Sequence, residues 1–140
     1  RARAGAQNIV PNSTGAAKAI GKVVPSVNGK LQGHAQRVQV PDGSVTELTT
    51  VLNTETTADE INEAFKAAFS DTDYYGYNDE GIVSSDILGD THGGVFDPTQ
   101  TDVNTIDGVT LARTVSFYDN EYGFTSNMIR TLLYFAEISE

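Results

Sequence analysis

The sequence predicts an α+β fold, with a mixed, largely antiparallel sheet and helices packed on one face. Strand-like segments are often joined by turns instead of helices, which favours antiparallel neighbours. Helical segments with one apolar side lie between and after these strands, and such a side is buried against a sheet. At 140 residues the chain is long enough for a real core, so we expect about one domain over residues 1–140.

The first predicted helix follows the stretch NSTGAAKAIGKVVP, residues 12–25. Ser13 and Thr14 are residue types that cap a helix start, and the alanines after them are strong helix formers. Pro25 ends the helix. Gly15 allows close approach to the backbone, and free N–H groups at a helix start can bind an oxyanion. These residues alone favour an ordinary capped helix over a phosphate site.

Two strands are predicted next, and they are expected to pair with each other as a hairpin. Residues 30–40 alternate as an extended strand, in which Arg37 points to the face opposite two valines. A PDGS turn separates this strand from residues 45–52, which are rich in β-branched side chains.

Two further helices are predicted. Residues 57–69 begin with a T-x-x-E capping box, formed by Thr57 and Glu60, and continue with apolar residues at helical spacing. Residues 125–138 are predicted to form the last helix. Its predicted buried side consists of Met128, Ile129, Leu132, Leu133 and Ala136.

The remaining segments are predicted to be strands and turns. Two short strands are expected within IVSSDILGD, residues 82–90, and GGVFDPTQT, residues 93–101. Asp107 and Gly108 form a turn signal before a longer strand over residues 109–120. Four apolar side chains of that strand share one face.

Composition excludes several function classes. The formal charge is −10, from 9 basic and 19 acidic residues, which argues against a nucleic-acid partner because such binders need a basic face. There is no cysteine, hence no disulfide, no thiolate nucleophile and no cysteine metal site. His34 and His92 are too far apart in sequence to suggest a metal cluster, and no apolar run approaches a membrane span. No G-x-G-x-x-G fingerprint occurs, so we expect that this chain is not itself a dinucleotide-binding half.

Four stretches, in the same order, resemble glyceraldehyde-3-phosphate dehydrogenases. RARAGAQNIVPNSTGAAKAIGKV resembles the family segment that enters a helix of the catalytic domain, and NGKLQGHAQRVQVP resembles the next turn and strand. VSSDILGD with GGVFDPTQT is similar to a later pair of strands, and SFYDNEYGFTSNMIRTLLYFA to the last strand and helix. The tail resembles versions from Gram-positive lactic bacteria. We therefore expect residues 1–140 to be the C-terminal part of such a catalytic domain, as a fragment of a longer protein.

The resemblance implies a homotetrameric, cytoplasmic, glycolytic oxidoreductase that uses NAD and inorganic phosphate to oxidise and phosphorylate glyceraldehyde 3-phosphate. In the family a cysteine thiolate attacks the aldehyde and a histidine takes the proton, and both precede the position of Arg1. The resemblance also implies that the family's NAD-binding Rossmann domain is absent from this chain. The isolated chain is therefore expected to be inactive and not to bind NAD tightly. The alternative is a non-catalytic, dehydrogenase-like module for binding or assembly.

The resemblance also implies phosphate-binding residues and no metal ligand. Thr14 and Gly15 match residues that bind the attacking phosphate, and Arg1 matches an arginine near that site. Arg37 matches the arginine that holds the substrate phosphate, which suits a guanidinium because its fork meets two phosphate oxygens. We expect Thr14 and Arg37 to border one positive pocket in an otherwise negative molecule.

Two cofactor-binding residues are implied near the C-terminus. Asn120 matches the asparagine that pairs with the nicotinamide carboxamide, for which an amide offers both a donor and an acceptor. Phe124 stands where the family usually has a tyrosine beside the nicotinamide ring, so ring packing is expected without the hydroxyl's hydrogen bond. Without the resemblance, Asn120 would be a turn residue and Phe124 a core aromatic.

Overall fold

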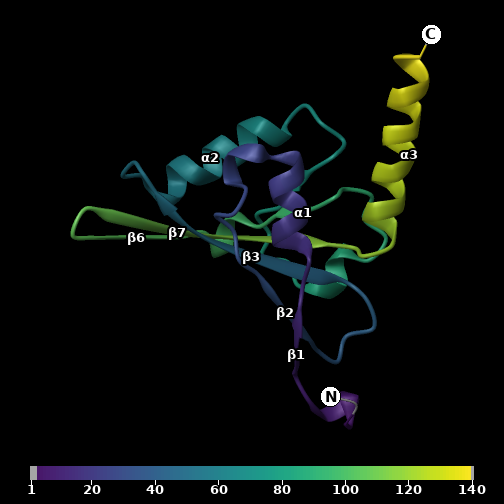
Figure 1. Cartoon of the computed structure of the whole chain (residues 1–140), viewed down its shortest axis with the longest axis horizontal. Helices are drawn as coiled ribbons and strands as arrows, with labels where there is room; N and C mark the ends of the chain where they lie inside the picture. Colours follow the sequence, from purple (N-terminus) through teal and green to yellow (C-terminus); the bar gives the residue numbers. More distant parts are fainter. Residues whose placement is uncertain (1–2, 140) are drawn as a thin grey trace. The chain divides into compact units, whose positions relative to one another are not determined.

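The chain forms two separate sheets, one in each of two units. The computed structural model describes residues 3–139, and it divides into a unit that ends at Pro41 and a unit that begins at Asp42. Figure 1 shows the helices and strands of both units.

The first unit is built around a two-stranded antiparallel ribbon. Its elements are β1 (Val10–Ser13), α1 (Ala16–Val23) and β2 (His34–Arg37), with short 3-10 helices at Gly5–Gln7 and Pro25–Val27. In the ribbon, Val10 lies opposite Arg37 at one end and Ser13 lies opposite His34 at the other. Helix α1 therefore leaves the ribbon at the end that is far from Arg37.

The second unit holds a five-stranded sheet and two longer helices. Its elements are β3 (Ser44–Leu52), α2 (Ala58–Phe69), β4 (Gly76–Tyr77), β5 (Val95–Phe96), β6 (Asp102–Ile106), β7 (Val109–Tyr118) and α3 (Tyr122–Glu137), with 3-10 helices at Ser84–Ile87 and Pro98–Gln100. The strand order is β3-β7-β5-β4, and β6 also pairs with β7. The β4–β5 pair is parallel and the others are antiparallel. The predicted α+β class with a mixed, largely antiparallel sheet is confirmed.

The predicted hairpin between residues 30–40 and residues 45–52 is wrong. β2 pairs with β1, whereas β3 pairs along its whole length with β7. The strand expected over residues 30–40 is also shorter, since β2 has four residues. β7 has ten residues, so it offers β3 a full ladder of backbone hydrogen bonds that β2 cannot provide.

The Asp107–Gly108 turn is confirmed, and it joins β6 to β7. Asp107 has a φ of 51° and Gly108 a φ of 77°, and the flanking residues Ile106 and Val109 lie opposite each other. Two positive φ values suit a two-residue hairpin turn, because its twist then matches that of the strands. The sequence gives little sign of β6, because only Val103 and Ile106 are apolar among its five residues.

One of the two short strands predicted over residues 82–101 is a 3-10 helix instead. The Asp86 carboxylate accepts a hydrogen bond from the Val83 N–H at 2.8 Å, which turns the chain before a strand can extend. The second expected strand is confirmed as β5.

Helix α2 covers one face of the sheet through aromatic packing. The ring of Phe65 stacks on that of Phe96 with centroids 4.1 Å apart, and Phe96 is fully buried. The predicted capping box is confirmed, because Thr57 Oγ1 accepts from the Glu60 N–H at 3.2 Å and Glu60 Oε2 accepts from the Thr57 N–H at 2.9 Å. The box fixes where the helix begins, and thereby which of its side chains reach the sheet.

The opposite face of the sheet carries exposed apolar side chains, and we call it the outer sheet face. Residues that lie opposite each other in adjacent strands share a face, and this places the odd-numbered residues of β7 on the side away from Phe96. The exposed members of the outer sheet face are Val45, Val51, Ile106, Val109 and Leu111. The predicted one-sided apolar pattern of residues 109–117 is therefore real, but part of it is not buried within the chain.

The last helix, α3, begins at Tyr122 and is anchored near its middle, at Arg130. The Arg130 guanidinium donates to the Thr91 carbonyl at 2.7 Å and lies over the Tyr74 ring. The buried side predicted for this helix is wrong, since Met128, Ile129, Leu132 and Leu133 are 46–60% exposed. The helical spacing is correct, but the described chain supplies no layer to cover these side chains.

Candidate functional site

The start of α1 combines a side-chain cap with free backbone donors. Thr14 Oγ1 accepts a hydrogen bond from the Ala16 N–H at 3.2 Å. The first helical bond runs from the Ala19 N–H to the Gly15 carbonyl at 3.0 Å, so the N–H groups of Ala17 and Lys18 remain available for other partners. The Thr14 hydroxyl accepts in the cap and keeps its own proton to donate. The helix start can therefore be capped and still bind an oxyanion.

Of the two residue types that predict a capped helix start, Ser13 and Thr14, Ser13 does not cap α1. Ser13 belongs to β1, where it lies opposite His34. Gly15 is the N-cap residue and carries no side chain to cap with. The hydroxyl of Thr14 is thus the group that contacts the open helix end.

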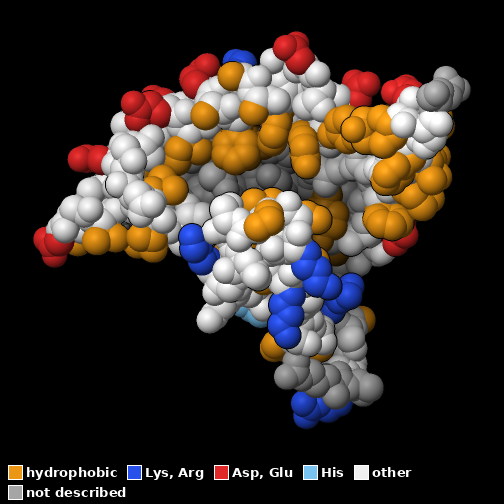
Figure 2. Space-filling model, turned by 45° about the horizontal axis from the view of Figure 1, so that its top comes forward, with side chains coloured by type: hydrophobic (Ala, Val, Ile, Leu, Met, Phe, Trp, Pro, Cys, Tyr) orange, Lys and Arg blue, Asp and Glu red, His pale blue; other side chains and the backbone are white. Residues whose placement is uncertain are grey.

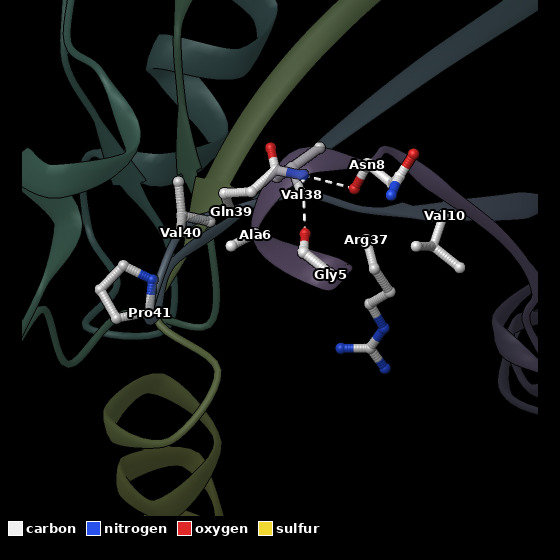
Figure 3. Close-up of a pocket in the computed structure, with 9 residues that line it drawn as sticks. All are labelled: Gly5, Ala6, Asn8, Val10, Arg37, Val38, Gln39, Val40 and Pro41. Carbon is white, nitrogen blue, oxygen red and sulfur yellow. Dashed lines mark hydrogen bonds between the residues drawn. The ribbon is translucent and has the colours of Figure 1, made fainter. Parts of the chain in front are cut away.

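Arg37 lies at the other end of the ribbon, beside a cavity of ≈ 470 Å³. Figure 3 shows its guanidinium extending away from the Gln39 side chain, whose amide donates to the carbonyls of Gly5 and Asn8. Arg37 is exposed and forms no ion pair with any residue in the described part of the chain. A guanidinium without a carboxylate partner keeps its five donors available for an anion.

Thr14 and Arg37 do not share this cavity, which corrects the expectation of one common pocket. The cavity is lined by residues 37–41 and by Gly5, Ala6, Asn8 and Val10, but not by Thr14. The Ser13–His34 pair and the Val10–Arg37 pair lie three positions apart along the ribbon, which is about 10 Å along a strand. The two groups therefore suit two anions in separate positions. Arg1 lies outside the described residues.

The two units carry opposite charge. Residues 1–41 contain six of the nine basic residues and none of the 19 acidic ones. Figure 2 shows most of the basic side chains gathered on the first unit, and the acidic ones on the second. Although the net charge of the chain is −10, residues 1–41 therefore form a cationic segment. Thr14, Gly15 and Arg37 all lie in that segment, where every charged side chain is basic and favours an anion.

Asn120 follows β7 at the turn into α3, where Ser44 holds its side chain. The Ser44 hydroxyl donates to Asn120 Oδ1 at 2.8 Å. Asn120 is exposed, whereas Ser44 is half-buried at the first position of β3. The amide nitrogen of Asn120 is therefore presented to solvent with both of its protons available.

Asp119 holds the backbone around Asn120, and the sequence analysis missed it. This carboxylate is 3% exposed and accepts hydrogen bonds from three N–H groups, those of Gly89 at 2.8 Å, Glu121 at 2.8 Å and Tyr122 at 2.6 Å. The Gly89 bond, followed by the Tyr122 and Glu121 bonds, holds the pKa of the Asp119 carboxyl below its ordinary value of 3.8, although burial acts in the opposite direction. An Asp two to three residues before a helix start is a recognisable turn signal.

Phe124 lies in the first turn of α3, four residues after Asn120. Its side chain is 69% exposed, so the alternative that it is a core aromatic of this chain is wrong. The ring of Phe124 and the amide of Asn120 are therefore both available to a partner outside the described chain.

Comparison with known proteins places this arrangement in a family. A family model described as glyceraldehyde 3-phosphate dehydrogenase, C-terminal domain, matches residues 1–120. The chain therefore belongs to this family of dehydrogenase domains, as the resemblance predicted.

Individual relatives agree with the family assignment. The chain is 59% identical over all of its 140 residues to a glyceraldehyde-3-phosphate dehydrogenase of Streptococcus pyogenes, and the match covers 41% of that protein. It is 58% identical over 137 residues, 98% of the chain, to a glyceraldehyde-3-phosphate dehydrogenase of Lactobacillus delbrueckii subsp. bulgaricus, of which it covers 40%. The chain thus spans about two fifths of the length of these relatives. Within residues 3–139, none of the helices is both long and apolar enough to cross a membrane.

Proposed function

We propose that this chain is the C-terminal part of the catalytic domain of a glycolytic, NAD-dependent, phosphorylating glyceraldehyde-3-phosphate dehydrogenase. The observation that carries the proposal is the cationic first unit. It lacks acidic residues, and it presents an unpaired guanidinium at one end of its ribbon and an open helix start at the other. The reaction handles two phosphate groups, and this unit offers two separate places for them.

Each phosphate-binding residue has a distinct role in the proposal. Arg37 holds the phosphate of the substrate, through the bidentate geometry that a guanidinium permits. Thr14 donates its hydroxyl proton to the attacking inorganic phosphate, and the backbone after Gly15 adds N–H donors at the positive end of the α1 dipole. Arg1 is proposed to add a further positive charge to that second phosphate.

Asn120 and Phe124 are proposed to hold the nicotinamide of NAD. The free amide protons of Asn120 can donate to the carboxamide oxygen, and the exposed Phe124 ring can pack beside the pyridine ring. NAD supplies the hydride acceptor when bound. The chain contains no cysteine, so the nucleophile has to be supplied by a segment other than this one.

Association into a homotetramer in the cytoplasm is part of the same proposal. The outer sheet face supports it, because Val45, Val51 and Leu111 are exposed there beside the Arg113–Glu47 ion pair. An apolar sheet face interrupted by a few charged groups is typical of a surface that meets another copy.

A chimeric enzyme tests the proposed function. The matching 140 residues of the Streptococcus pyogenes relative are replaced by this chain, and NADH formation is measured with glyceraldehyde 3-phosphate and inorganic phosphate. We expect turnover within tenfold of the parent enzyme, no turnover by the isolated chain, and a loss of at least tenfold in kcat/KM for Arg37→Ala. Lys30→Ala, which removes a charge from the same unit, is the matched control. A folded chimera without activity would favour the non-catalytic module instead.

A further inference from the structure

The Asn120 side chain needs an external restraint in order to discriminate between ligands. An asparagine amide presents a donor on one side and an acceptor on the other, and it can turn about its side-chain bonds. Asn120 is exposed, so packing does not hold it. Two neighbours do, and neither is part of the proposed contacts with phosphate or nicotinamide.

The first restraint acts on the backbone. Asp119 accepts the N–H groups of Glu121 and Tyr122, which follow Asn120, and it also accepts the Gly89 N–H from a loop on the other side. These bonds hold the two peptide units that follow Asn120, and they tie the Asp119 side chain that precedes it to the Gly89 loop. The carboxylate is buried, so water does not compete with them.

The second restraint acts on the side chain itself. Ser44 is the first residue of β3 and lies opposite Tyr118, two residues before Asn120. Its position is fixed by the longest strand pairing in the unit. From there its hydroxyl donates to Asn120 Oδ1 at 2.8 Å, which occupies one lone pair of that oxygen and turns the amide N–H₂ outward.

We propose that Ser44 is a positioning residue that presets the amide of Asn120 for a ligand carboxamide. The identity of that ligand rests on the proposed function, whereas the restraint itself does not. In the preset orientation the Asn120 N–H₂ donates to a carbonyl oxygen, and the second lone pair of Oδ1 accepts an N–H from the same ligand. A ligand with a carbonyl but no N–H can make the first contact and not the second.

The restraint is tested first by NMR on the 140-residue chain. We expect Ser44→Ala to move the side-chain amide resonances of Asn120 towards those of a freely rotating asparagine. Ser44→Thr keeps a hydroxyl on a residue suited to a strand, and it retains the parent resonances. Thr49→Ala, which removes an exposed hydroxyl from the same strand, leaves them unchanged. Parent-like Asn120 signals in Ser44→Ala, or freely rotating ones in Ser44→Thr, would overturn the proposal.

Kinetics of the chimera then test the consequence for the cofactor. We expect Ser44→Ala to raise KM for NAD about three- to tenfold, the range for one net hydrogen bond, while KM for phosphate stays the same. With 3-acetylpyridine adenine dinucleotide, which has a ketone in place of the carboxamide, the increase is smaller. Ser44→Thr restores the parent values. An unchanged KM for NAD in Ser44→Ala would overturn the positioning role, while the activity of the chimera would still support the proposed function. An inactive chimera without the Ser44 substitution would count against the proposed function alone.

Discussion

Phe96 provides the most quantitative test of the fold. It is fully buried in β5, its ring stacks on Phe65 at 4.1 Å, and the Tyr77 ring lies 5.8 Å away. Phe96→Ala removes a ring from a site without solvent and leaves a cavity, which costs about 3–5 kcal/mol. Small domains are stable by only about 5–15 kcal/mol, so the variant is expected to lose a large part of its free energy of unfolding.

The assay is urea unfolding followed by circular dichroism, with Phe124→Ala as the matched control. The same truncation at Phe124 removes a ring that is 69% exposed, and it should change the free energy of unfolding by less than about 0.5 kcal/mol. A loss below about 1.5 kcal/mol for Phe96→Ala would refute the packing of α2 on the sheet. Equal losses for the two variants would do the same, because they would erase the difference between core and surface.

Three further predictions follow from single contacts. Thr57→Ala removes the hydroxyl that accepts the Glu60 N–H and should lower the free energy of unfolding by about 1 kcal/mol, measured by thermal melting beside the exposed control Thr49→Ala. The pKa of Asp119 is lowered in the folded chain, so its stabilising contribution is complete above about pH 4 and is lost as the pH falls through its folded pKa. In a plot of the free energy of unfolding against pH, Asp119→Asn should therefore reduce the fall at acid pH, whereas Asp73→Asn should not. Phe124→Tyr should leave KM for NAD in the chimera within about threefold, since the aromatic face is retained, and a larger change would show that the ring does not pack as proposed.

The elements that could be predicted from sequence are those with local signals. The capping box of Thr57 and Glu60 and the Asp107–Gly108 turn are set by neighbouring residues, so the sequence defines α2 and the β6–β7 turn without knowledge of the rest. The partner of β3 is different, because β7 lies more than fifty residues away. A strand's own side chains specify its faces but not its neighbour.

The candidate site divides in the same way. Thr14, Gly15, Arg37, Asn120 and Phe124 were named from a resemblance, since each alone is an ordinary helix start, strand or turn residue. Ser44 carries no sequence signal, because its role depends on the 2.8 Å contact with Asn120 across the fold. Asp119 carries a local turn signal before α3, but its bond to the Gly89 N–H depends on the fold. The exposure of the apolar side of α3 cannot be predicted from its sequence, because helical periodicity shows that a face is apolar but not what covers it.

Phosphate binding by the first unit is the central claim, and it can be measured on the 140-residue chain by titrating inorganic phosphate and following backbone amide and Arg37 side-chain resonances. We predict two groups of shifts, one at residues 14–18 and one around Arg37. Arg37→Ala should abolish the second group and leave the first, and Lys30→Ala should preserve both. Undiminished phosphate binding around residue 37 in Arg37→Ala, or no shift at the start of α1 in the parent chain, would contradict the account.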